Sequence, residues 1–183
     1  MRKLVVSTWI TLDGVFDADT MAQWYTPFDS EARQTYIKEG ILACDAILFG
    51  RTTYEMLAPY WSSLHDNEMG VAAKLNSAPK YVVSSKLKKA DWNNTTIIGT
   101  DVIAEITRLK QEPGREIQIE GSALLVQSLV EADLIDEYRL LVHPIIAGKG
   151  KRFFLDGMTT GALTLVKTQP LDKGVLVLYY ERA

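Results

Sequence analysis

Glycine, hydroxyl and basic residues follow three short apolar segments of this 183-residue chain. The groups are Gly50, Arg51, Thr52 and Thr53, then Ser84, Ser85 and Lys86, and last Gly121, Ser122, Ala123 and Leu124. Glycine lets a backbone approach a ligand closely, and a helix that begins there offers free N–H groups to a phosphate. Hydroxyl and guanidinium groups add hydrogen-bond donors for the same anion. The three groups together predict a binding site for a dinucleotide.

Each group also has a plain structural explanation. A Gly-Ser pair before a helix is commonly a break followed by an N-cap. Arg51 alone is commonly a surface ion-pair former, and Ser84-Ser85 alone is commonly a turn. The pattern GxGxxG does not occur in the sequence, so the prediction does not rest on a Rossmann fingerprint. A ligand is favoured because three segment ends share one design.

Apolar runs and helical spacing predict the elements that bring these groups together. The expected strands cover 4–12, 46–49, 81–83, 96–98, 117–119, 138–142, 163–166 and 175–180. One helix begins after Asp29 or Ser30, either of which can cap it. Further helices are expected over 52–57, 68–76, 102–110 (capped by Asp101) and 124–130, with loops over 13–28 and 59–67.

Strands and helices alternate through most of the chain, and the last two strands follow one another. This order predicts a single α/β domain over 1–183, with a mostly parallel mixed sheet, helices on both faces and a C-terminal antiparallel hairpin. In a parallel sheet the carboxyl ends of the strands lie at one edge, where open α/β folds bind ligands. The three groups should therefore meet there.

Composition excludes several classes of protein. The net charge of −3 and the dispersed basic residues provide no field for nucleic acid or anionic lipid. No apolar stretch approaches the roughly 20 residues that cross a membrane. The single cysteine, Cys44, excludes a disulfide within the chain and favours the cytoplasm. His65 and His143 are far apart in the sequence, so no metal site is expected.

Several segments resemble known reductases. The run from Phe49 to Glu55 resembles the strand–GR-T–helix segment of dihydrofolate reductases, and Val83-Ser84-Ser85 resembles their second phosphate-contacting strand end. The stretch from Ile119 through Leu134-Ile135-Asp136-Glu137 to Gly148-Lys149-Gly150 is similar to the RibD C-terminal domain, the reductase half of riboflavin-pathway deaminase-reductases. The resemblance covers essentially the whole chain in order, including the turn Thr11-Leu12-Asp13-Gly14.

The resemblance implies a dihydrofolate reductase-like three-layer fold with NADPH as hydride donor. It implies that Gly50 to Thr53 contact phosphate, that Ser84 and Ser85 lie at the adenosine ribose, and that Gly121 to Leu124 lie along the pyrophosphate. Arg51 and Lys86 are the candidates for the 2′-phosphate. The implied substrate is a small heterocycle of pterin or pyrimidine type, as for 5-amino-6-(5-phosphoribosylamino)uracil reductase and dihydrofolate reductase.

Two carboxylates are the catalytic candidates. Trp24-Tyr25-Thr26-Pro27-Phe28-Asp29 has the spacing of the Trp-x-x-Pro-x-Asp segment of dihydrofolate reductases, whose buried Asp serves substrate protonation. A carboxyl group in an apolar pocket would have a raised pKa. The alternative is that Asp29 only caps a helix. Asp13 lies near the expected cleft, or is only a turn residue before Gly14. Glu120, beside the expected pyrophosphate, would be unfavourable unless it points away.

The role of four aromatic residues and the class of function each have two open interpretations. Trp9, Trp24, Tyr25 and Phe28 either stack on a flat heterocycle or belong to the core. The resemblance implies an NADPH-dependent reductase, and the alternative is a non-catalytic nucleotide-binding module that kept the fold. The apolar strands near the C-terminus, over 140–142, 163–166 and 175–180, need a cover. A second copy of the chain would cover these strands, and the resemblance also points to a homodimer.

Overall fold

The structure is a computed structural model that describes residues 1–158 and 161–183. Its strands form one eight-stranded sheet in the order β4-β3-β2-β5-β1-β6-β8-β7. The strands are β1 (Lys3–Thr11), β2 (Ala46–Gly50), β3 (Lys80–Val83), β4 (Thr95–Ile98), β5 (Glu116–Ile119), β6 (Glu137–His143), β7 (Leu163–Pro170) and β8 (Leu176–Arg182).

The helices connect the strands. The α-helices are α1 (Met21–Trp24), α2 (Glu31–Ala43), α3 (Arg51–Trp61), α4 (Ala72–Ser77), α5 (Val102–Gln111) and α6 (Ala123–Glu131). Short 3-10 turns are η1 (Ala18–Thr20), η2 (Thr26–Phe28), η3 (Glu68–Gly70) and η4 (Asp172–Gly174).

Pairing within the sheet confirms the predicted mixed topology. β1 pairs in parallel with β5 and β6, and β2 pairs in parallel with β5 and β3. β8 pairs antiparallel with both β6 and β7, so the C-terminal hairpin forms one end of the sheet. The carboxyl ends of β1, β2, β3, β5 and β6 consequently lie at one edge.

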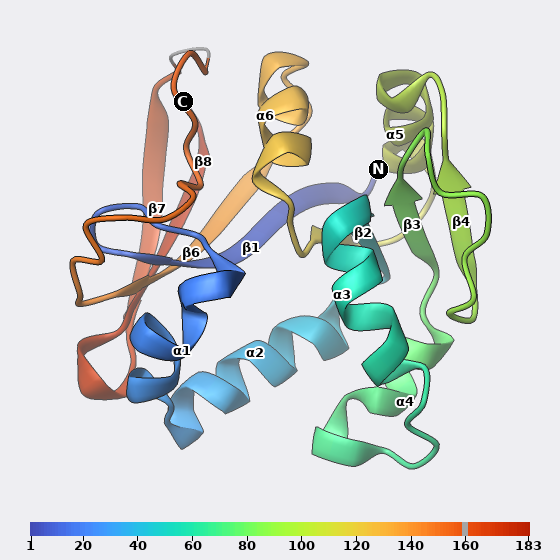
Figure 1. Cartoon of the computed structure of the whole chain (residues 1–183). Coiled ribbons are helices and arrows are strands. Elements are labelled where there is room, and N and C mark those ends of the chain that lie inside the picture. Colours follow the sequence, from blue (N-terminus) through green and yellow to red (C-terminus); the bar gives the residue numbers. More distant parts are fainter. Residues whose placement is uncertain (159–160) are drawn as a thin grey trace.

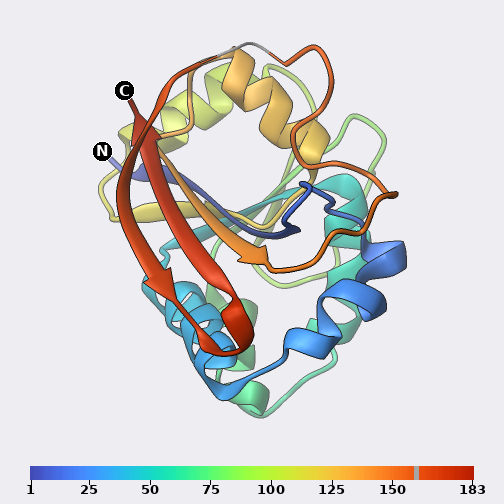
Figure 2. The ribbon, with the colours of Figure 1, turned by 90° about the vertical axis from the view of Figure 1, so that its left-hand side faces the viewer.

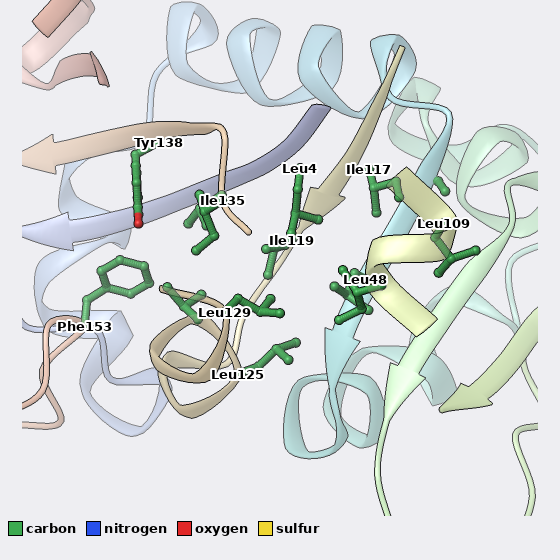
Figure 3. Packing of buried hydrophobic residues seen from close by; sticks show 14 of the residues in the cluster. Leu4, Leu48, Leu109, Ile117, Ile119, Leu125, Leu129, Ile135, Tyr138 and Phe153 are labelled. Atoms are coloured by element: carbon green, nitrogen blue, oxygen red, sulfur yellow. The ribbon is translucent and has the colours of Figure 1, made fainter. Parts of the chain in front are cut away.

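Helices cover both faces of the sheet (Figures 1 and 2). On one face, Ile106 and Leu109 of α5 and Leu129 of α6 pack against the strand residues Leu48 and Ile119. Figure 3 shows this cluster from close by, with Tyr138 extending toward Phe153 at its other end. On the opposite face, β2 and β3 pack against α3, α4 and the end of α2. The molecule is therefore a three-layer α/β structure.

Ordinary local signals set most element boundaries. Ser30 precedes α2, and its hydroxyl accepts a hydrogen bond from Arg33 N at 3.2 Å. β2 is buried along its whole length, as expected for a central parallel strand. α6 begins directly after Ser122 and buries Leu125, Val126 and Leu129. These caps and apolar runs located the strands and several of the helices from the sequence.

Four local expectations were wrong. The segment 13–28 contains α1 and short 3-10 turns rather than only loop. α3 continues through Pro59 to Trp61, because a proline in the last turn removes only one backbone hydrogen bond. The helix expected over 68–76 is divided by Met69, whose φ of 54° is left-handed. Asp101 precedes α5 with a left-handed φ of 49°, and its side chain makes no capping bond.

Candidate nucleotide-binding edge and active site

Two of the predicted groups meet where β2 and β5 end. Gly50 N donates a hydrogen bond to Gly121 O at 2.9 Å. A Cβ on Gly50 would lie 2.6 Å from Ser122 Oγ, so any larger residue there would push the two turns apart. Gly121 has a φ of +117°, which only glycine adopts without strain. Both glycines are therefore required for the close approach of these turns.

The N-termini of α3 and α6 begin at these turns. The residues preceding them, Gly50 and Ser122, make no side-chain capping bond to the first turn of either helix. The first N–H groups of a helix need an acceptor, and a phosphate is a suitable one. Thr53 Oγ1 lies 3.1 Å from the position that a Cβ on Gly121 would occupy, so a hydroxyl reaches the same turn. We call Gly50 to Thr53 together with Gly121 to Leu124 the cradle.

Arg51 is the basic residue of the cradle, and Ser84, Ser85 and Lys86 follow β3, the strand that pairs with β2. The Arg51 side chain is 41% exposed, and its Nη1 binds Glu55 Oε2 at 2.6 Å, one helical turn away. Ser84 is buried, and its Oγ accepts hydrogen bonds from Lys86 N at 3.1 Å and Leu87 N at 2.9 Å. Ser84 therefore holds the turn after β3, while Ser85 and Lys86 are exposed.

The Asp13 carboxylate links the turn after β1 to the loop after β6. Its carboxylate accepts hydrogen bonds from Thr11 Oγ1 at 2.6 Å, Ala147 N at 3.0 Å and Gly148 N at 2.9 Å. These donors, with the Thr11 hydroxyl the strongest, lower the pKa of Asp13 from 3.8 to about 2. A carboxylate this acidic is a poor proton store near neutral pH, so the geometry favours the turn interpretation of Asp13.

Asp29 lies on the surface rather than in an apolar pocket. Its oxygens accept hydrogen bonds from Gln34 Nε2 and from Arg33 Nη2, each at 2.8 Å. Both donors lower the pKa of Asp29, that of Gln34 more strongly, which is the opposite of the expected shift. The residue that caps α2 is Ser30. Asp29 therefore joins the chain before α2 to its first turn.

The aromatic residues expected at the cleft surround a histidine. Trp24, Tyr25 and Phe28 place their rings 5.5–5.8 Å from the ring of His143, which is fully buried at the end of β6. His143 Nε2 lies 3.3 Å from Arg33 Nη1. Burial, with the Arg33 charge, lowers the pKa of His143. Trp24 is itself buried, so it belongs to the core.

The acid that the sequence did not select is Glu120. Side chains alternate along β5 and into the next residue, so Ile117 and Ile119 join the cluster under α5 and α6. Gln118 and Glu120, which directly follows β5, lie with Tyr36 and Gly40 of α2. Burial raises the pKa of Glu120 to about 7, although a hydrogen bond from Gln118 Nε2 opposes the shift. Glu120 thus points away from the cradle and keeps a proton near neutral pH.

Metal clusters and membrane-spanning helices are both absent from the part of the chain that the structure describes. Residues 1–158 and 161–183 contain no group of three His, Cys, Asp or Glu side chains that could hold a metal ion. None of the helices described there has the length and apolarity to cross a bilayer.

The sequence of this chain is similar to a known protein family and to other bacterial proteins. Residues 2–177 match the family model of the RibD C-terminal domain. The chain is 28% identical over 181 residues to the uncharacterized protein YyaP of Bacillus subtilis (strain 168), an alignment that covers 98% of this chain and 94% of YyaP.

Solved structures share the fold at lower identity. A putative riboflavin biosynthesis protein of Shewanella sp. PV-4 has a TM-score of 0.70 and 19% identity, covering 99% of both chains. Dihydrofolate reductase of Enterococcus faecalis, complexed with NADP(H), has a TM-score of 0.64 and 15% identity, covering 98% of this chain and 96% of that one. These likenesses show a dihydrofolate reductase-like fold.

Proposed function

Since the chain belongs to the RibD C-terminal domain family, we propose that it is an NADPH-dependent reductase of a small heterocycle of pterin or pyrimidine type. The observation that supports this most is the cradle. Two helix N-termini without side-chain caps begin at turns that touch through Gly50 N and Gly121 O, 2.9 Å apart. This arrangement suits the pyrophosphate of a dinucleotide.

The other candidate residues fit a 2′-phosphorylated cofactor. Arg51 is the cation of the cradle and Lys86 is an exposed cation after β3, the strand that pairs with β2, and a guanidinium binds phosphate through paired hydrogen bonds. Arg51 must first give up Glu55, so binding exchanges one carboxylate partner for a doubly charged phosphate. NADPH, when bound, supplies the hydride, and the protein supplies orientation and electrostatics.

Glu120 is our candidate for the proton that accompanies hydride transfer. It directly follows β5 and precedes Gly121 of the cradle, and its pKa of about 7 keeps the carboxyl group half protonated at neutral pH. A general acid is most effective when its pKa lies near the working pH. Asp13 and Asp29 lack this property, because hydrogen-bond donors lower the pKa of both.

Cofactor titration tests the proposal. NADPH should bind more tightly than NADH, and Arg51→Ala should weaken NADPH binding by about 10- to 100-fold, the value of one charge-assisted contact of ~1.5–3 kcal/mol. Arg108→Ala is the matched control, because Arg108 also pairs with a glutamate one helical turn away, at 2.9 Å, but on α5. Equal affinities of the wild type for NADPH and NADH would refute the assignment.

A non-catalytic nucleotide-binding module is the second candidate. It is favoured by one observation, the lowered pKa values of Asp13 and Asp29. The two candidates differ in turnover. Stoichiometric NADPH binding without oxidation by any pterin or pyrimidine would support the module, whereas oxidation that is lost in Glu120→Gln would support the reductase.

A further inference from the structure

A small cavity lies between α2 and the sheet, beneath Glu120. Its volume is about 20 Å³, and its lining includes Ser7 of β1, Tyr36 and Gly40 of α2, Gln118 of β5, and Glu120, which directly follows β5. One water molecule needs roughly 10–15 Å³ and two to four polar partners. The cavity therefore has the size and polarity of a site for a single water.

The amide of Gln118 leaves one polar atom without a partner. Its Nε2 donates a hydrogen bond to Glu120 Oε1. Its Oε1 is buried and accepts no hydrogen bond from the residues that the structure describes. If the amide were turned, its nitrogen would face the cavity instead. A buried polar atom without a partner costs about 1–3 kcal/mol, so a partner in the cavity would stabilise either arrangement.

Gly40 keeps the cavity open. Glycine within a helix is about 1 kcal/mol less favourable than alanine, and the backbone of Gly40 is helical rather than left-handed. A Cβ at Gly40 would lie 3.7 Å from Gln118 Oε1, an ordinary contact distance. Alanine would therefore fit and would strengthen α2. What glycine preserves at this position is the space beside Gln118.

The groups around Glu120 leave its charge without a direct counter-ion. Burial raises the pKa of Tyr25, Tyr36 and Cys44, so these groups are neutral near pH 7. Arg139 of β6 also lines the cavity, but its guanidinium is bound by Glu116 at 2.8 Å and Glu137 at 2.6 Å. A water in the cavity would therefore be a direct source of protons for the Glu120 carboxylate.

We propose that the cavity binds one water molecule between Gln118, Ser7 and Glu120, and that this water returns a proton to Glu120 after each turnover. When the Glu120 O–H bond breaks, the proton goes to the substrate and both electrons come from the hydride. The water then gives a proton to the carboxylate and receives one from hydronium in the solvent. The returning role rests on the proposed function, whereas the water site rests on the cavity alone.

The variant Gly40→Ala tests the water site without turnover. Its methyl group would displace the water and remove a donor from the carboxylate. The pH midpoint of the Glu120 carboxyl band, followed by infrared difference spectroscopy and identified by its loss in Glu120→Gln, should then rise by about one unit. Ser7→Ala should shift the midpoint in the same direction. Thr35→Ala, an exposed change on α2, is the control and should leave it unchanged.

Kinetics test the returning role. In Gly40→Ala the first turnover should keep its rate because Glu120 is already protonated, while steady-state turnover should fall about tenfold. An unchanged infrared midpoint in both Gly40→Ala and Ser7→Ala would overturn the water site. A shifted midpoint with unchanged steady-state turnover would overturn the returning role. A midpoint that shifts in both variants, together with a wild type that oxidises no NADPH with any pterin or pyrimidine, would retain the water site and reject the proposed function.

Discussion

Carboxylates in this chain take opposite states according to their neighbours. Asp13 receives three hydrogen bonds, and its pKa falls to about 2. Glu120 receives one hydrogen bond in a crowded site, and burial raises its pKa to about 7. Donors stabilise the charged form and burial destabilises it, and the number of donors decides which effect is larger. Of these two carboxyl groups, Glu120 is therefore the one suited to exchange a proton near neutral pH.

The raised pKa of Glu120 predicts a pH-dependent loss of stability. The unfolded chain releases this proton near pH 4.5, whereas the folded protein retains it to about pH 7. The free energy of unfolding should therefore fall as the pH rises through this window, by at most about 3 kcal/mol. Glu120→Gln removes the effect. Relative to wild type, the variant should gain stability between pH 5 and pH 8 in urea unfolding.

The control for this prediction is Glu131→Gln, an exposed residue at the end of α6. Its stability should follow that of the wild type at both pH values. If Glu120→Gln also followed the wild type, the pKa of the Glu120 carboxyl group would not be raised in the folded protein, and its role as the proton donor would have to be abandoned.

At the scale of elements, the sequence revealed the strands better than the site. Continuous apolar runs such as β2 identify buried strands whatever surrounds them. The sequence also indicates Ser30 as the N-cap of α2. The surface position of Asp29 was also readable, because Arg33 stands four residues further on, at ion-pair spacing. The alternation of Ile117, Gln118, Ile119 and Glu120 was sufficient to place Glu120 on the opposite face from Ile119.

Other features depend on contacts between distant segments. The sequence does not show that Gly40 lies over Gln118, because these residues meet only when α2 packs on the sheet. It equally does not show that Asp13 reaches Ala147 and Gly148. The path of α3 through Pro59 depends on its packing, since Ala58 is buried against the neighbouring cluster. Tertiary contacts of this kind override local preference.

The connection between the turn after β1 and the loop after β6 should depend on Asp13. Asp13→Asn replaces an acceptor by an N–H group opposite a backbone donor, so we expect a loss of about 1–3 kcal/mol in unfolding free energy at pH 7. Native-state hydrogen exchange should show faster exchange at Ala147 and Gly148. In the wild type this contribution is complete above pH 3.8 and is lost as the pH falls through about 2.

Asp19→Asn provides the comparison for Asp13. Asp19 pairs with Lys151 at 2.9 Å on the surface of the same region, and exposed pairs contribute about 1 kcal/mol or less. Equal effects of the two substitutions would show that Asp13 acts as an ordinary surface charge rather than as a fastening between the loops.

At the scale of the whole molecule, helices cover both faces of the sheet, but one of its edges is the strand β7. This strand lies at the end of the strand order, and it presents Leu163, Leu165 and Val166 with exposed fractions of 38%, 49% and 51%. Its neighbour β8 is different, because Val177 is fully buried. An exposed edge strand with apolar side chains is prone to pair with another chain. We therefore propose that β7 is the contact between two copies of the protein.

Charging β7 should separate the dimer without unfolding the protomer. Leu165→Lys and Val166→Lys alter exposed positions, so light scattering at micromolar concentration should change from the mass of two chains to that of one. Met56→Lys, exposed to a similar degree on α3, should leave the dimer intact.

Val177→Glu would be uninformative because it places a charge in the core. In the wild type, the thermal midpoint should rise with protein concentration, since association stabilises the folded state. A wild-type mass of one chain would reject the dimer, and a dimer that persists in both lysine variants would place its contact elsewhere.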